Sequence, residues 1–368
     1  MLAATYPEKD DQWLFDKARL VISALMAKIH TVEWTPAIIA NPVTERAMYA
    51  NWWGLVGNAE ARDKYGAEFD KLAEDLAKSD SWVRRILGLD PKMSEALDNG
   101  KAIEWAVTGL AGARNSDNAG VPFTLTEEFV AVYRMHPLLR DTVDVYDIGS
   151  NVVSESIPLT ETRDGDAEDI LDDQGGDRLW YSFGVTLPGA LTLRNYPEFL
   201  RDLYVPGRGV IDLATIDIIR DRERGVPRYN EFRRQIGLTP INDFTDLTDD
   251  AEIVSELRRL YDNDVEKIDA LVGQLAETVR PEGFGFGETA FQIFIMNASR
   301  RIIADRFYTA DYNPETYTQE GYDWVENTTM VDVLKRHYPA LDLSLVGVDN
   351  AFKPWGLNIP ADYDNWAA

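Results

Sequence analysis

The sequence contains no cysteine and only three histidines in 368 residues. The absence of cysteine excludes disulfide bonds, iron–sulfur clusters, thiolate zinc sites and cysteine nucleophiles. So few histidines disfavour a histidine-rich metal centre. Any chemistry that needs an imidazole therefore has to use His30, His136 or His337.

Positive charge is scarce as well. The chain has 37 lysine and arginine residues against 63 aspartate and glutamate residues, which gives a net charge of −26 at pH 7 and a pI near 4.5. This charge would repel a phosphate polymer or an anionic membrane surface. We therefore expect no nucleic-acid partner and no electrostatic docking on membranes.

A long hydrophobic run is also missing. The longest apolar stretch near the N-terminus is Leu20–Ile29, which contains Lys28 and is too short to span a bilayer. The first residues, MLAATYPEKDDQ, have neither the basic nor the apolar segment of a secretory signal. The sequence thus predicts a cytoplasmic protein without a transmembrane segment.

What the chain does have is apolar residues at helical spacing. Hydrophobic residues make up 45% of the sequence, enough for a packed core. One apolar face recurs through Leu14, Ala18, Val21, Leu25 and Ile29. This pattern predicts a helix over 10–38 that Asp10 or Asp11 caps and that Thr35-Pro36 breaks or kinks.

The rest of the chain also favours helices. The acidic, glycine-containing region 141–176 is predicted to be a solvated loop. Alternating strand patterns are scarce, so we expect a mainly α fold, with residues 1–368 forming one large domain. The remaining helices are expected at 67–78, from Thr124 as an N-cap with Glu127 three residues on, around 186–204, over 212–238 with a break at Gly225, within 248–278 and over 287–308.

The common catalytic motifs are absent from the sequence. No GxxxxGK[ST], HExxH or GxSxG pattern occurs. The segment GFGFGE at 283–288 follows no predicted strand, so we interpret it as a flexible lead into a helix. A carboxylate di-iron centre needs a glutamate three residues before its histidine, and Tyr133 stands at that place before His136.

Tyr133 and His136 form the most informative local pair. If both lie on one helix, the i, i+3 spacing places their side chains on one face. A neutral imidazole can then ligate haem iron while a phenol sits beside the ring. The alternative is that both residues pack in the core. Two interpretations also remain for His30, Arg300 and Arg301. They are either side chains that pack in the core or extend to the surface, or groups that bind a carboxylate.

Taken together, several segments resemble the fatty acid α-dioxygenases of the haem peroxidase–cyclooxygenase superfamily. The resemblance covers nearly all of residues 5–356, and its segments occur in the order found in that family. The segments are KIHTVEWTPAII, TEEFVAVYRMHPLL, LTLRNYPEFL, DLATIDIIRDRERGVPRYNEFR and ETAFQIFIMNASRRIIADRFYT.

The resemblance implies a haem peroxidase-like helical domain that binds haem b. In this family pattern His136 is the proximal ligand of the haem iron and Tyr133 is the residue that becomes a radical. Asn195 falls where the superfamily places an asparagine that orients the proximal imidazole.

The resemblance also implies the substrates. Fatty acid and O₂ are converted to a 2-hydroperoxy fatty acid after a hydroperoxide activates the haem. His30, Thr35 and Arg301 match the residues that bind the substrate carboxylate, with Arg300 as the neighbouring alternative. Uptake of fatty acid would bring the protein to a membrane surface.

One departure from the family pattern concerns the N-terminal part. The family carries a distal histidine and a calcium loop upstream of the segments above, and here only His30 precedes the proximal motif. We therefore expect a chain that lacks the N-terminal distal-side portion, with the calcium site outside it. The alternatives are a haem peroxidase without fatty acid oxygenation and a non-enzymatic truncated relic.

Overall fold

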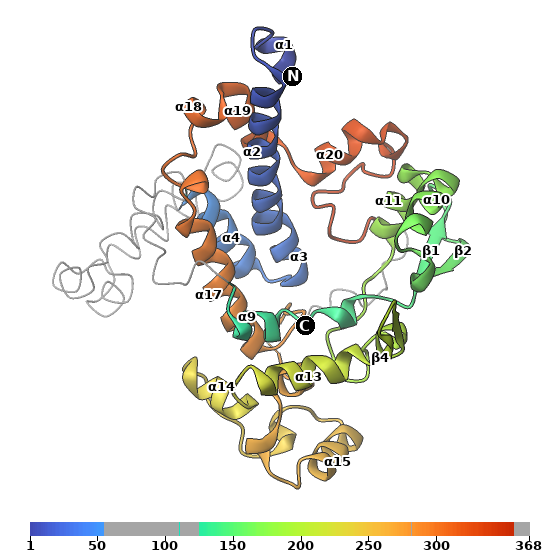
Figure 1. Cartoon of the computed structure of the whole chain (residues 1–368), viewed down its shortest axis with the longest axis vertical. Coiled ribbons are helices and arrows are strands. Elements are labelled where there is room, and N and C mark those ends of the chain that lie inside the picture. The colour runs from blue at the N-terminus through green and yellow to red at the C-terminus, as the bar shows by residue number, and fades with distance from the viewer. Residues whose placement is uncertain (55–109, 111–124, 281, 357–368) are drawn as a thin grey trace, which may run out of the picture. The chain divides into compact units, whose positions relative to one another are not determined.

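The chain divides into two compact units. Unit 1 comprises Met1–Phe123 and Asn297–Met330, and unit 2 comprises Thr124–Met296 and Val331–Ala368. The prediction of a single domain stays a prediction, and the helix expected at 67–78 lies outside the described residues. The computed structural model describes residues 1–54, 110, 125–280 and 282–356 (Figure 1).

Unit 1 consists of helices in its described part. The predicted helix over 10–38 is present but is interrupted by a π-helical turn. Its elements are α1 (Leu2–Thr5), α2 (Asp11–Ile29), the π-helical turn η1 (His30–Trp34), α3 (Thr35–Ile38), α4 (Pro42–Trp53), the end of α17 (Glu288–Ala304), η8 (Arg306–Tyr308), α18 (Pro314–Tyr317) and α19 (Gln319–Asn327).

The helix α2 begins and ends for local reasons. The Asp10 side chain accepts a hydrogen bond from Trp13 N at 2.8 Å and so caps the N-terminus, as predicted. The predicted break at Thr35-Pro36 takes the form of the π-helical turn, after which α3 continues with Pro36 in its first turn. Since proline has no N–H for the carbonyl four residues earlier, the regular ladder cannot pass through this point.

A buried lysine ties α2 to α19 in unit 1. Lys28 is 2% exposed, and its Nζ donates to the carbonyl oxygens of Val325, Glu326 and Thr328 at 2.7, 2.9 and 3.0 Å. These are the last carbonyls of a helix, which lack partners within it. The hydrophobic core beside this contact comprises Val21, Ala24, Val32, Trp52, Leu110, Ile303, Tyr312, Tyr317 and Val325.

Unit 2 is mainly helical and has two small antiparallel sheets. The sheets pair β1 with β2 and β3 with β4. Its elements are α9 (Glu127–Val132), η4 (His136–Leu138), β1 (Thr142–Tyr146), β2 (Val153–Pro158), η5 (Leu159–Glu161), α10 (Gly165–Gln174), α11 (Gly176–Val185), α12 (Glu198–Arg201), β3 (Leu203–Val205), β4 (Gly209–Ile211), α13 (Leu213–Glu223), α14 (Tyr229–Gln235), η6 (Phe244–Asp246), α15 (Ala251–Leu260), η7 (Val265–Lys267), α16 (Ala270–Ala276), the start of α17, α20 (Met330–His337) and η9 (Pro339–Leu341).

Two predictions for unit 2 were wrong. Region 141–176 is not a loop, because it contains a β-hairpin and the helix α10, although α10 has no buried residue and is solvated as predicted. Region 186–204 is not a helix, apart from the short α12. Pro188 and Pro197 lie within this region, and Arg194 has a positive φ of 62°, which a helix cannot accommodate.

The helices predicted over 212–238, within 248–278 and over 287–308 are present, and the fold is mainly α. The helix expected over 212–238 is present as α13 and α14, which are separated at Gly225, where φ is 75°. Of the one or two short acidic helices expected within 248–278, α15 is present with Glu252 and Glu256, whereas α16 has no acidic residue and is buried at most positions. The apolar helix over 287–308 is α17 followed by η8.

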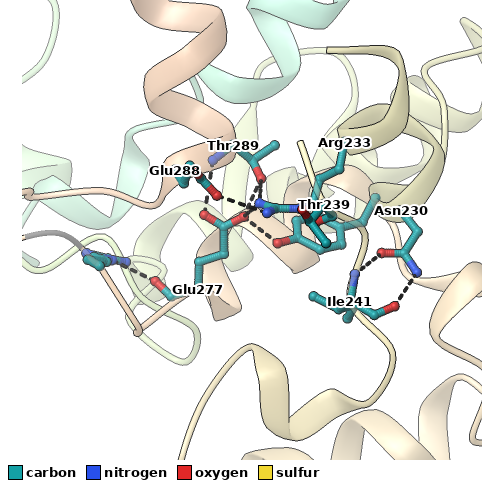
Figure 2. A network of polar contacts seen from close by, with 9 residues as sticks. Asn230, Arg233, Thr239, Ile241, Glu277, Glu288 and Thr289 are labelled. Atoms are coloured by element: carbon teal, nitrogen blue, oxygen red, sulfur yellow. Dashed lines mark hydrogen bonds and ion pairs between the residues drawn. The ribbon is translucent and has the colours of Figure 1, made fainter. Parts of the chain in front are cut away.

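A buried polar network joins α14, α16 and the start of α17 (Figure 2). Arg233 Nη1 lies 3.1 Å from Glu277 Oε1 and donates to Thr289 Oγ1 at 2.8 Å, while Nη2 lies 2.9 Å from Glu288 Oε2. The hydroxyls of Tyr229 and Thr289 donate to Glu277 as well. Because every charge in this interior site has a partner, the network fixes where α17 begins.

We expect Arg233→Met to lower the free energy of unfolding by about 3 kcal/mol, because it leaves the buried Glu277 carboxylate without its cation. The neighbouring Arg234→Met is the control, since Arg234 forms exposed pairs with Glu231 and Glu266 and should cost less than about 1 kcal/mol. Urea denaturation of both variants measures the difference. Equal losses would contradict the assignment of the stabilisation to the buried network.

Candidate functional site

The segment that carries Tyr133 and His136 is not one helix. The helix α9 begins after Thr126, whose side chain accepts from Phe129 N at 3.2 Å, and it ends at Val132. The predicted cap, Thr124, lies outside the described residues. The prediction that Tyr133 and His136 share a helical face is wrong, because Pro137 lacks the N–H that a continuing helix would need.

The His136 imidazole is held by a chain of polar side chains from two other segments. Its Nδ1 lies 3.2 Å from Tyr196 Oη, and that hydroxyl donates to Asp217 Oδ2 at 3.1 Å. Nδ1 lies 3.8 Å from the same carboxylate oxygen, which is beyond hydrogen-bonding distance. Arg134 Nη1 pairs with the other oxygen, Asp217 Oδ1, at 2.9 Å. Asp217 is 2% exposed and lies on α13.

Burial sets the protonation states of this group at neutral pH. Desolvation lowers the pKa of His136 below its ordinary value, against the opposing effect of the Asp217 carboxylate. Desolvation and the same carboxylate raise the pKa of Tyr196 well above its ordinary value. The group therefore contains a neutral imidazole and a protonated phenol.

The second ring nitrogen of His136, Nε2, is available to bind a metal. No residue in the described part of the chain hydrogen bonds to Nε2, and the His136 side chain is 25% exposed. A neutral imidazole nitrogen with an available lone pair is the donor that haem iron takes from a protein. The donor chemistry of His136 thus fits the proximal role implied by the resemblance.

The hydrogen bonds of Asn195 go to the backbone and not to the imidazole. Its Nδ2 donates to Ala190 O at 2.7 Å and to Pro137 O at 3.3 Å, so it fastens its own loop to the backbone next to His136. The loop comes so close that a Cβ on Gly189 would lie 2.1 Å from Pro137 O. The structure therefore differs from the expectation for Asn195, since the next residue, Tyr196, reaches Nδ1.

Tyr133 lies in an aromatic stack. Its ring is nearly parallel to those of Phe129 and Phe294, with centroid distances of 5.1 and 5.9 Å and interplanar angles of 18° and 13°. Burial raises the pKa of Tyr133, which keeps the phenol protonated at neutral pH. The stack fixes the orientation of the ring plane.

The predicted carboxylate-binding residues all belong to unit 1. His30 begins the π-helical turn, stacks on Trp34 at 4.7 Å, and has its pKa lowered by burial. Thr35 is 2% exposed, and its hydroxyl donates to His30 O at 2.8 Å. Arg301 is half-buried on α17. The side chain of Arg300, the neighbouring alternative, lies outside the described set.

These segments of unit 1 share one core. Val32 lies between His30 and Thr35, and Ile303 follows Arg301 by two residues; both belong to the same buried hydrophobic cluster. Tyr133, His136 and Asn195 belong to unit 2. The six predicted residues thus form two groups, one in each unit.

Sequence reasoning missed the buried acidic residues of α13, one of which, Asp217, lies near His136. Asp217 and Asp221 lie one helical turn apart on α13, and a carboxylate on a charged helix ordinarily faces solvent. Asp221 is 4% exposed, and neither of its carboxylate oxygens has a hydrogen-bond partner. The only available signal was the Arg134 between Tyr133 and His136, because a buried arginine needs a carboxylate partner.

A polar hollow of about 350 Å³ lies beside Tyr196. It is lined by Leu139, Arg140, Asp141, Pro188, Gly189, Arg194, Asn195, Tyr196, Pro197 and Glu198.

In the described residues, no cluster of histidine, aspartate or glutamate side chains has the arrangement of a metal site. No helix in the described ranges is long and apolar enough to cross a membrane.

Comparison with known proteins agrees with the predicted resemblance. A family model described as animal haem peroxidase matches residues 1–346. Alpha-dioxygenase 2 of Arabidopsis thaliana is 39% identical over 370 residues, which cover 97% of this chain and 53% of that protein. This chain spans about half the length of the curated relatives it matches.

Solved structures agree with the predicted fold. A crystal structure of a variant of the Oryza sativa fatty acid alpha-dioxygenase with palmitic acid matches with a TM-score of 0.81 and 36% identity, covering 97% of this chain and 55% of that chain. Peroxidase A from Dictyostelium discoideum, at 22% identity and a TM-score of 0.61, shares the fold and covers 91% of this chain and 51% of its own. The haem peroxidase-like fold and the resemblance to α-dioxygenases are confirmed.

We expect Asp221→Asn to stabilise the protein at neutral pH and not in acid. Burial, with a contribution from Asp217, raises the pKa of Asp221 from 3.8 to about 6. The folded protein therefore keeps a proton that the unfolded chain releases, and wild-type stability falls as the pH rises from about 4 to about 6. Asparagine carries no such penalty, so its advantage should grow by about 2 kcal/mol between pH 4 and pH 7.5.

Urea denaturation at the two pH values measures this change. Glu223→Gln serves as the control for charge on α13, because its side chain is exposed. An advantage of Asp221→Asn that is the same at both pH values would contradict the raised pKa.

Proposed function

Because the chain belongs to the animal haem peroxidase family, we propose that it acts in haem-dependent oxygenation of fatty acids at C2, giving 2-hydroperoxy fatty acids. The observation that carries the proposal is the pairing of an open imidazole nitrogen on His136 with a stacked phenol, Tyr133, three residues before it. The similarity to proteins named fatty acid alpha-dioxygenases supports the substrate class.

His136 would hold haem b through Nε2, because Nδ1 is already engaged by Tyr196. Haem bound there supplies a one-electron oxidising equivalent after reaction with a hydroperoxide activator. The contact of Asn195 with Pro137 O would help to hold the proximal segment in place.

Tyr133 would carry the chemistry on the protein side. Its raised pKa keeps the phenol protonated at neutral pH. A phenol that loses an electron becomes a very strong acid, so the proton leaves with the electron and a neutral radical remains. The radical takes the hydrogen from C2 of the fatty acid, and O₂ adds to the carbon radical. The resulting peroxyl group takes a hydrogen atom back from Tyr133, which restores the radical and gives the 2-hydroperoxide.

His30, Thr35 and Arg301 would bind the substrate carboxylate. With its lowered pKa, His30 is a neutral imidazole, and the Thr35 hydroxyl would exchange its hydrogen bond to His30 O for one to the carboxylate. The positive charge that a carboxylate requires therefore comes from Arg301. A location in the cytoplasm, with contact at membrane surfaces during fatty acid uptake, stays a prediction from the sequence.

Two substitutions separate haem binding from oxygenation. We expect His136→Ala to abolish the Soret band that develops on titration with haemin, because it removes the iron ligand. Tyr133→Phe should bind haemin as the wild type does but form no 2-hydroperoxide from palmitic acid, because phenylalanine has no phenolic hydrogen to lose.

His337→Ala is the matched control and should change neither measurement. Turnover of a phenolic reductant without formation of 2-hydroperoxide in the wild type would favour a plain peroxidase. No Soret band in the wild type, or an unchanged one in His136→Ala, would contradict the assignment.

The role of Arg301 is tested by binding rather than by turnover. We expect Arg301→Leu to weaken binding of palmitic acid about 10- to 100-fold, which corresponds to one lost charge-assisted hydrogen bond. Hexadecanol has the same tail without the carboxylate, so its affinity should not change. Arg306→Leu, at a side chain 67% exposed, is the control, and calorimetric titration measures all three proteins. An equal loss for acid and alcohol would contradict the role.

A further inference from the structure

The Tyr196 hydroxyl has one proton and two polar neighbours. It lies 3.1 Å from Asp217 Oδ2 and 3.2 Å from His136 Nδ1. A phenol can donate only one hydrogen bond. If one of its two neighbours can only accept, the phenol donates to that neighbour and accepts from the other. The polarity of the whole chain of contacts is therefore set at its buried end.

Asp217 is that end. Its carboxylate is 2% exposed, and its Oδ1 forms an ion pair with Arg134 Nη1 at 2.9 Å. An ionised carboxylate only accepts hydrogen bonds. Tyr196 therefore donates its proton to Oδ2 and presents lone pairs, not a proton, to His136.

The tautomer of His136 follows from this direction. Because Tyr196 Oη accepts, Nδ1 has to carry the ring proton, and Nε2 keeps its lone pair. This is the form of the imidazole that can ligate a metal through Nε2, and hydrogen bonding at the opposite nitrogen also holds the ring orientation.

We propose that Tyr196 and Asp217 are the positioning residues that fix the tautomer and orientation of the proximal imidazole, in place of Asn195. The inference about the tautomer stands on the contacts of the chain itself; its link to iron rests on the proposed function. Asn195 cannot serve this purpose where it lies, because its amide nitrogen donates to the carbonyl oxygens of Ala190 and Pro137.

The test uses the full chain without haem. Long-range ¹H–¹⁵N correlation spectra of the histidine rings distinguish the two neutral tautomers directly. The sequence has three histidines, and His136→Ala identifies the signals of His136. At pH 7.5 we expect the wild type to show mainly the Nδ1–H form of His136.

Tyr196→Phe removes the acceptor, and we expect the ratio of the two forms to shift about fivefold toward Nε2–H, as loss of one hydrogen bond implies. Asp217→Asn should shift it in the same direction, because an amide can donate to Oη and lets the phenol donate to Nδ1. Circular dichroism checks that each variant is folded, and either folded variant by itself tests the proposal.

Tyr204→Phe is the matched control, since Tyr204 is 62% exposed on β3 and should leave the ratio unchanged. A wild type with mainly the Nε2–H form would overturn the proposal. So would an unchanged ratio in folded Tyr196→Phe, or a shift in Asn195→Ala that Tyr196→Phe does not produce.

A second measurement connects the tautomer to iron. In haemin-loaded, reduced protein we expect the iron–imidazole stretching frequency to fall in Tyr196→Phe, because the hydrogen bond from Nδ1–H makes the ligand more basic. An unchanged frequency would overturn the effect on the ligand. If the wild type binds no haemin, the proposed function fails, while the spectra of the haem-free chain still decide the tautomer.

Discussion

A charge taken out of water is costly unless it is paired, and the pairing of Asp217 organises the region around His136. An unpaired charge in the interior costs several kcal/mol, so Asp217 requires both the guanidinium of Arg134 and the hydroxyl of Tyr196. These partners come from the segment after α9 and from the loop before α12, while Asp217 itself lies on α13. One buried charge thus joins three parts of unit 2 that no hydrophobic pattern would bring together.

Unit 1 uses the same principle near its own candidate residues. Lys28 is buried and satisfies three carbonyls at the end of α19, and Glu33 accepts from the backbone N–H of Met330 at 3.1 Å. Both residues flank His30, so the π-helical turn is held from two sides by polar contacts. A turn of this kind has weak hydrogen bonds of its own and persists because its surroundings fix it.

Prediction from the sequence succeeded where local signals decide the structure. The cap at Asp10 and the break at Gly225 depend on neighbouring residues, and both were found. Prediction failed for β1 and β2, because β2 is exposed at nearly every position and so shows no alternating apolar pattern. It failed for Tyr133 and His136 as helical neighbours, because the effect of Pro137 on the preceding turn was overlooked.

The amino-acid sequence sets which chemical groups are available: three imidazoles, no thiol, and a phenol three residues before His136. It also determined the family, since the matching segments run in order along nearly the whole chain. Which groups surround the imidazole depends on the folded chain. Tyr196 lies 60 residues from His136 along the chain, and no local periodicity encodes a contact over that distance. The choice of Tyr196 over the adjacent Asn195 follows from side-chain direction in an irregular loop, which is set by the packing of Gly189 on Pro137 and by the charge of Asp217.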